Sequence, residues 1–195
     1  MEGRGPAGAK KKALAEDYAI YYHDEATLQP AANVVCTYAP KGQTPVLALH
    51  DTKGYQHVCL ASSICATGEL FFRIRDTSFK GEGIVAYLKE LLASTARKIL
   101  LIWDNASWHK SAETLAFLRS QEGRRLWVAR TPPYAPELNP DELVWAHLKR
   151  VLLPNRVVKN AKELKVMAQQ AMTTIQNSTE LVKSFFNSQN YHFTH

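Results

Sequence analysis

The sequence predicts an α/β fold in which a mixed β-sheet is flanked by helices. Two patterns support this class. Early in the chain, short β-branched or aromatic runs are separated by Pro, Gly and Asp-Thr-Lys-Gly turn signals, as in an antiparallel meander. Later, runs with helical spacing alternate with apolar strand-like runs. With 195 residues, 46% of them hydrophobic and 22% charged, the chain is long enough to enclose one sizeable core.

The N-terminal third is expected to hold a lead segment followed by strands. Residues 1–16 are rich in Gly, Ala and Lys and show no apolar period, so we expect a flexible lead. Order should begin near Tyr18, and one ordered domain is expected over residues 17–178. The strand-like runs are residues 18–24, 33–38, 46–49, 57–64 and 70–74.

From about residue 84 the pattern changes to alternating helices and strands. Ile84, Leu88 and Leu91 recur at helical spacing, whereas Ile99–Trp103 contains no polar residue, as in a strand covered on both faces. Residues 179–195 are expected to form a C-terminal tail or a short helix. The other predicted elements are a helix near 111–120, a strand at 125–129, a helix opening at Asn139-Pro140 and an amphipathic helix at 161–176.

Composition excludes some classes of protein and weakly favours others. The net charge of +6 favours contact with a polyanion such as nucleic acid, although many basic proteins bind none. No apolar stretch is long enough to span a membrane, and the N-terminus lacks the apolar core of a signal peptide. Cys36, Cys59 and Cys65 lack a usual zinc-ligand spacing, which favours free buried thiols. We therefore expect a soluble cytoplasmic protein without membrane contact.

Asp104 is a candidate site residue because it directly follows the apolar run Ile99–Trp103. Ligands of sheets with parallel strands tend to lie beyond the carboxyl ends of the strands, where this carboxylate would sit. The alternative is an Asp that caps a helix opening near Ser107 or Ser111. The sequence leaves both interpretations open.

A second acid lies in the Pro-rich segment that opens the next helix. Asn139 is a favoured N-cap and Pro140 a favoured first helical residue, which leaves Asp141 and Glu142 in the first turn. Acids stabilise this end of a helix without any catalytic role. On a helical wheel Asp141 lies with Trp145 and Glu142 does not, so periodicity does not choose between the two acids.

The third candidate, Asp24, ends the early run that starts at Tyr18, where an Asp often caps a turn. His23 could be a metal ligand, but alternation along a strand directs it to the opposite face from Asp24. Together, Asp24, Asp104 and Glu142 could hold divalent metal ions for phosphodiester chemistry. Without a cation, three clustered acids would repel one another and raise a pKa.

Several of these motifs resemble the DDE transposases of the mariner superfamily, most closely its bacterial insertion-sequence branch. The resemblance lies in Asp104-Asn105, His109 and the segment Pro132–Trp145, which reads Pro-Pro-Tyr-Ala-Pro-Glu-Leu-Asn-Pro-Asp-Glu-Leu-Val-Trp. His23-Asp24-Glu25 and Tyr38–Pro45 are also similar to that branch. The likeness covers about Tyr18 to Arg150.

The resemblance implies an RNase H-like fold, with an antiparallel start to the sheet and a parallel extension. It identifies Asp24, Asp104 and Glu142 as the catalytic acids and metal ligands, and so chooses Glu142 over Asp141. The implied cofactor is Mg²⁺ or Mn²⁺, as two ions. The implied chemistry is DNA strand cleavage at transposon ends, followed by attack of the freed 3′-hydroxyl on target DNA.

Four further residues are expected to support this site or to contact DNA. Asn105 and His109 match positions of the family motif, and each could orient a site residue or bind a phosphate. His109 could also be a surface residue that opens a helix. Lys149 and Arg150 could contact DNA phosphates or simply form a solvated helix face. Trp103 and Trp145 are expected in the core, and Trp108 could pack or stack on an extruded base.

Members of this superfamily also carry an N-terminal helix-turn-helix region that reads the transposon ends. About 17 residues precede the first predicted strand, so we expect end recognition from a separate chain, from a longer product, or not at all. The resemblance further implies a homodimer acting on transposon ends and target DNA, associated with the nucleoid. The competing function is a non-catalytic DNA-binding or assembly module derived from a transposase.

Overall fold

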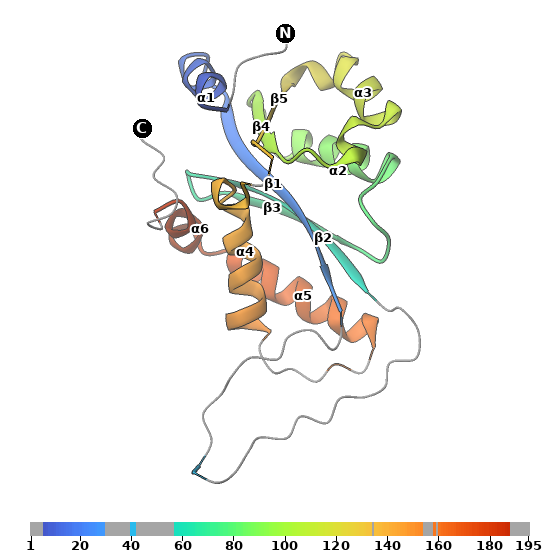
Figure 1. The fold of residues 1–195 in the computed structure, drawn as a ribbon, viewed down its shortest axis with the longest axis vertical. Coiled ribbons are helices and arrows are strands. Elements are labelled where there is room, and N and C mark those ends of the chain that lie inside the picture. The colour runs from blue at the N-terminus through green and yellow to red at the C-terminus, as the bar shows by residue number, and fades with distance from the viewer. Residues whose placement is uncertain are drawn as a thin grey trace.

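Five strands form one mixed sheet in the order β3-β2-β1-β4-β5 (Figure 1). The computed structural model describes residues 6–29, 40–41, 57–133, 135–153, 158 and 160–187. The predicted strands at 33–38 and 46–49 lie outside the described residues. The strands are β1 (Ala19–Leu28), β2 (Val58–Cys65), β3 (Leu70–Arg75), β4 (Ile99–Trp103) and β5 (Leu126–Arg130).

The sheet begins antiparallel and continues parallel, as predicted. β1 pairs antiparallel with β2, and β2 pairs antiparallel with β3. On its other side β1 pairs parallel with β4, which pairs parallel with β5. β1 is therefore the central strand, and it pairs with β4 at Ala19–Tyr22 and with β2 at Tyr21–Leu28.

Helices cover both faces of the sheet (Figure 1). The α-helices are α1 (Pro6–Ala15), α2 (Glu82–Ala93), α3 (Ala112–Arg119), α4 (Asp141–His147), α5 (Ala161–Gln176) and α6 (Thr179–Phe186). Short helical turns are η1 (Ser107–Lys110), η2 (Gly123–Arg125) and η3 (Pro136–Leu138), and η4 (Leu148–Leu152) is a π-helical turn that extends α4.

Alternation along the strands divides the core into two layers. On one face, Leu101 and Trp103 of β4 pack with the apolar stripe of α2 and with α3. On the other face, Leu100 and Ile102 pack with residues of α1, α4, α5 and α6. Every residue of β4 is buried, as expected for a strand covered on both sides. Cys59 and Cys65 are buried free thiols, as predicted.

The N-terminal segment differs from the prediction, because residues 6–15 form α1 where the sequence predicts a flexible lead. Ala9 and Ala13 are four residues apart on the side of the helix that faces the sheet, and both are almost fully buried. The ammonium group of Lys10 lies 5.0 Å from the ring centre of Tyr22. Two alanines bury little apolar surface, so the periodic signal of this helix is weak in the sequence.

A tail or a short helix was expected for the C-terminal segment, and Thr179–Phe186 form the helix α6. Val182, Phe185 and Phe186 are buried on one of its faces and join the core layer of α4 and α5. Within the part of the chain that the structure describes, no helix has both the length and the apolar character needed to cross a membrane.

Candidate active site

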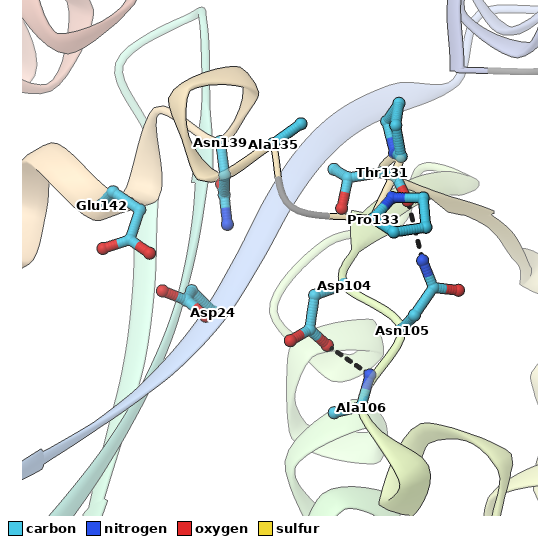
Figure 2. A pocket seen from close by; sticks show the side chains of 10 residues that line it. Asp24, Asp104, Asn105, Ala106, Thr131, Pro133, Ala135, Asn139 and Glu142 are labelled. Atoms are coloured by element: carbon cyan, nitrogen blue, oxygen red, sulfur yellow. Dashed lines mark hydrogen bonds between the residues drawn. The ribbon is translucent and has the colours of Figure 1, made fainter.

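The three predicted acids line one cavity of about 390 Å³. Asp24 comes from the central strand β1, Asp104 follows the last residue of β4, and Glu142 lies in the first turn of α4. Figure 2 shows the three carboxylates directed into the same open space from these separate elements. The cavity is lined by Asp24, Asp104, Asn105, Ala106, Thr131, Pro132, Pro133, Ala135, Asn139 and Glu142.

The parallel pairing of β1 with β4 brings Asp24 and Asp104 together. Tyr22 pairs with Ile102, so each acid lies two residues beyond a paired position on neighbouring strands. Asp24 points to the sheet face that α4 covers, and Trp145 of α4 donates a hydrogen bond of 2.9 Å from Nε1 to its Oδ2. Asn139 ties the start of α4 to β1, since its Nδ2 donates to the carbonyl oxygen of His23 at 3.2 Å.

Helix α4 starts at Asp141 with Pro140 as its N-cap, one residue later than the sequence predicts, but Asn139 still binds its first turn. Oδ1 of Asn139 accepts a hydrogen bond from the backbone N–H of Asp141 at 3.2 Å. Glu142 is exposed to the cavity, whereas Asp141 is fully buried and accepts a hydrogen bond of 2.6 Å from the Ser62 hydroxyl. The structure therefore distinguishes two acids that the helical wheel left undecided.

Like charges and burial disfavour ionisation of two of the three acids in the absence of a cation. Burial, followed by the charge of Glu142, raises the pKa of Asp24 to about 7. Burial and the charge of Asp104 raise the pKa of Glu142, while Lys149 acts in the opposite direction. These directions are those expected for carboxylates gathered around a position that a positive charge would occupy.

Asp104 is held differently, because a histidine neutralises it. Nδ1 of His109 lies 3.0 Å from Oδ1 of Asp104, and the same oxygen accepts a hydrogen bond from the backbone N–H of Ala106 at 2.9 Å. The hydrogen bond from His109 is the main reason why the pKa of Asp104 is lowered. His109 therefore supports a site acid directly, which was one of the roles predicted for it.

Glu25 is a residue that the sequence analysis did not assign to the site. Its Oε1 lies 3.1 Å from Nε2 of His109, and it accepts a hydrogen bond from Nε1 of Trp108 at 3.3 Å. Burial opposes ionisation, but the hydrogen bond from His109 lowers the pKa of Glu25 below its usual range. The available signal was alternation along β1, which puts Glu25 on the face opposite Asp24.

The remaining predicted residues fall into two groups. Asn105 lines the cavity, and its Nδ2 donates a hydrogen bond of 2.9 Å to the carbonyl oxygen of Thr131. Lys149 and Arg150 lie on η4, and neither is among the described residues that line the cavity. Trp103 and Trp145 are buried, as expected, whereas Trp108 is half-buried beneath the ammonium group of Lys80 at 5.1 Å.

The donor set of the cavity suits a hard divalent cation. Carboxylate oxygens are the ligands that Mg²⁺ prefers, and one or two carboxylates suffice for each ion because the ion keeps several waters. The raised pKa values of Asp24 and Glu142 indicate that added positive charge would stabilise the ionised site. The residues present therefore fit Mg²⁺ or Mn²⁺.

Comparison with protein families and solved structures is consistent with this geometry. The sequence profile described as "DDE superfamily endonuclease" matches residues 19–165, which contain all three acids. A comparison with curated proteins finds no match.

The fold is shared with structures of the mariner Mos1 transposase. The mariner Mos1 paired end complex with Mg aligns at a TM-score of 0.63 and 12% identity, covering 97% of this chain and 60% of that chain. The catalytic domain of Mos1 mariner transposase aligns at a TM-score of 0.54 and 11% identity, covering 95% of this chain and 89% of that chain. The predicted RNase H-like fold is thereby confirmed. The chain spans about 60% of the length of the transposase chains in the paired-end complexes.

Proposed function

The chain belongs to the family of DDE superfamily endonucleases, and from this membership we propose that it is the catalytic domain of a DNA transposase. In this proposal it cleaves DNA strands at the ends of an insertion-sequence element. It then joins the freed 3′-hydroxyl to target DNA. Asp24, Asp104 and Glu142 are the catalytic acids and hold two Mg²⁺ or Mn²⁺ ions.

One observation carries the proposal. Three carboxylates from β1, the end of β4 and the start of α4 line a single cavity, and burial and a neighbouring carboxylate raise the pKa values of two of them, Asp24 and Glu142. If the three acids had only a structural role, nothing would offset the repulsion among their charges in the cavity. Phosphodiester chemistry on a divalent cation gives this arrangement a use.

The protein's own residues would organise the reaction in distinct ways. When bound, the cations supply charge stabilisation at the attacking and leaving oxygens. Trp145 holds the Asp24 carboxylate from the α4 side, and His109 holds Asp104 from the η1 side. Asn105, at the rim of the cavity, is positioned to contact a DNA phosphate.

The partners in this proposal are transposon-end DNA and target DNA. The net charge of +6 supports contact with phosphates that weakens as salt is added. The similar Mos1 transposase structures are paired-end complexes, which supports a homodimer here. Recognition of specific ends would come from a helix-turn-helix region on this product or on a separate chain, and the complex would act at the nucleoid.

A nicking assay on supercoiled plasmid tests the proposal. The wild-type protein should convert the plasmid to open circles with Mn²⁺ or Mg²⁺ and not with EDTA. Asp104→Asn removes an ionised metal ligand and should slow nicking on the order of 10³-fold, equivalent to several kcal/mol of lost stabilisation. Gel-shift measurements on the same samples should show DNA binding unchanged.

Asp76→Asn is the matched control, because Asp76 is an exposed acid that pairs with Lys165 away from the cavity. It should nick plasmid at the wild-type rate. Equal nicking by wild type and Asp104→Asn would assign the activity to a contaminant and remove the proposal. DNA binding without any metal-dependent nicking would instead favour the non-catalytic assembly module.

A further inference from the structure

Three side chains on the α2 side of the sheet point their ligand atoms at one position. We propose that His23 Nε2, Glu25 Oε1 and His109 Nε2 bind one divalent transition-metal ion, with Zn²⁺ as the best match. These three ligand atoms all lie within 4.8 Å of one another, which is close enough for one metal ion to bind all three. The site is separate from the acid-lined cavity and does not depend on DNA cleavage.

The spacing of the ligand atoms fits a small tetrahedral ion. Oε1 of Glu25 lies 3.1 Å from Nε2 of His109 and 3.4 Å from Nε2 of His23. Zinc bonds of about 2.0–2.1 Å in tetrahedral geometry place neighbouring ligand atoms roughly 3.3 Å apart. Small side-chain rotations would therefore complete the site. Two imidazoles and one carboxylate suit Zn²⁺ better than Mg²⁺, which prefers oxygen ligands alone.

The hydrogen bonds of both histidines leave their Nε2 atoms facing Glu25. Nδ1 of His23 lies 2.7 Å from the carbonyl oxygen of Ser62, which can only accept, so this nitrogen must carry the proton. Nδ1 of His109 faces the carboxylate of Asp104 at 3.0 Å. Zinc-binding histidines usually donate their second ring N–H to a carbonyl or carboxylate in this way.

His23 supplies an independent sign of a ligand. Its side chain is fully buried, and within the described part of the chain its Nε2 finds no hydrogen-bond partner. In the neutral tautomer fixed by Ser62, this nitrogen presents a lone pair to a carboxylate oxygen 3.4 Å away. Two opposed acceptors in a buried site are unfavourable unless a proton or a metal ion lies between them, and a metal ion bound to both would satisfy them together.

The surrounding charge also favours a cation at this position. The carboxylates of Glu25 and Asp104 lie 3.1 Å and 3.0 Å from the two ring nitrogens of His109. Their negative charges would stabilise a metal ion that displaces the proton from Nε2 of His109. Glu25 and Trp108 also line a second cavity of about 380 Å³, from which water could supply a fourth ligand.

The two metal sites would be linked through His109. Its Nε2 would bind zinc while its Nδ1–H holds the Asp104 carboxylate that faces the acid-lined cavity. Zinc would thus act as a structural ion that fixes the orientation of an acid in a different site.

Zinc titration of untagged, metal-stripped protein tests the site directly. Calorimetry in millimolar Mg²⁺, which occupies oxygen-ligand sites, should show one Zn²⁺ bound per chain. Glu25→Gln, His23→Gln and His109→Gln should each weaken Zn²⁺ binding by at least about 100-fold. Asp24→Asn and Glu142→Gln, which alter the acid-lined cavity alone, should leave Zn²⁺ binding unchanged.

X-ray absorption at the zinc edge of the wild-type complex adds a measurement that needs no variant. It should show two imidazole ligands and no sulfur. Circular dichroism identifies any variant that fails to fold, and the folded ones carry the comparison. Zinc bound through sulfur, no zinc bound in Mg²⁺, or zinc retained by folded Glu25→Gln would each overturn the proposal.

Discussion

The indole Nε1 of Trp145 donates a 2.9 Å hydrogen bond to Oδ2 of Asp24, and so joins α4 to the central strand of the sheet. The two residues are 121 positions apart in the chain. The bond favours the ionised form of Asp24 against the burial that disfavours it. An aromatic residue expected to do no more than fill the core therefore also holds an acid of the candidate site.

Replacing this indole should impair the site more than the core. Trp145→Phe keeps an aromatic ring but removes the N–H, and a hydrogen bond to a charged group contributes about 1.5–3 kcal/mol. We expect nicking to slow by roughly 10- to 100-fold. Trp127→Phe on the edge strand β5 is the control and should nick normally. Equal rates for the two variants would show that the hydrogen bond is dispensable.

The contribution of Asp24 to the free energy of unfolding of the metal-free protein should fall as the pH rises from about 4 to 7. The folded state holds a proton on Asp24 up to a pH of about 7, whereas the unfolded state releases it near the usual Asp pKa of about 3.9. The folded state therefore binds more protons in this window, and its advantage is lost as pH rises.

Urea unfolding in EDTA at several pH values measures this effect. Asp24→Asn should make the slope shallower and raise stability at pH 7.5 on the order of 1–3 kcal/mol relative to wild type. Added Mg²⁺ should reduce the difference by stabilising the ionised wild type. Parallel stability curves for the two proteins would mean that Asp24 ionises normally.

The adjacent acids of α4 should behave in opposite ways. Burial and the charge of Asp24 raise the pKa of Asp141 well above its usual value, so the folded protein disfavours its ionised form. Asp141→Asn keeps the acceptor for Ser62 and should change stability by less than about 1 kcal/mol, with nicking retained. Glu142→Gln should abolish nicking. Loss of activity in both variants, with folding intact, would contradict the distinct roles of the two acids.

A side chain at Gly68, in the turn between β2 and β3, should lower the free energy of unfolding. Its φ is +96°, and a Cβ there would lie 2.3 Å from Cγ2 and 2.8 Å from the backbone oxygen of Thr179 at the start of α6. Gly68→Ala should therefore destabilise the protein by about 2–4 kcal/mol.

Gly81→Ala is the matched control for the backbone strain alone. Gly81 has a φ of +53°, and among the described residues no atom lies within 4 Å of a Cβ built there. It should cost only about 1–2 kcal/mol. Similar unfolding free energies for the two variants would show that α6 does not pack tightly on this turn.

Local pattern was sufficient to predict much of the sheet. The apolar run Ile99–Trp103 and the turn signals between the early runs gave strands close to the observed β2, β3, β4 and β5. Asp104 and the pair Asp141–Glu142 could be named as candidates because each lies at the end of a regular element, and the family resemblance chose Glu142 from the pair. Their convergence on one cavity depends on sheet order, which the residues alone did not supply.

Other features depend on contacts between distant segments and leave little local trace. Helix α1 packs on the sheet through Ala9 and Ala13, and their small side chains become informative only once the position of the sheet is known. Glu25 becomes informative only when β4 and η1 bring Trp108 and His109 beside it. Asp141 and Glu142 look alike in sequence, and only packing against β1 and β2 buries one of them.

The placement of Asp24 on the central strand of the sheet has a consequence for how the protein unfolds. Amide hydrogens of such a strand exchange only when the whole domain opens, whereas peripheral helices can fray on their own. The scaffold of the reaction centre should therefore persist through partial melting at the periphery. Activity should disappear in the same cooperative transition as the sheet, and not in an earlier one.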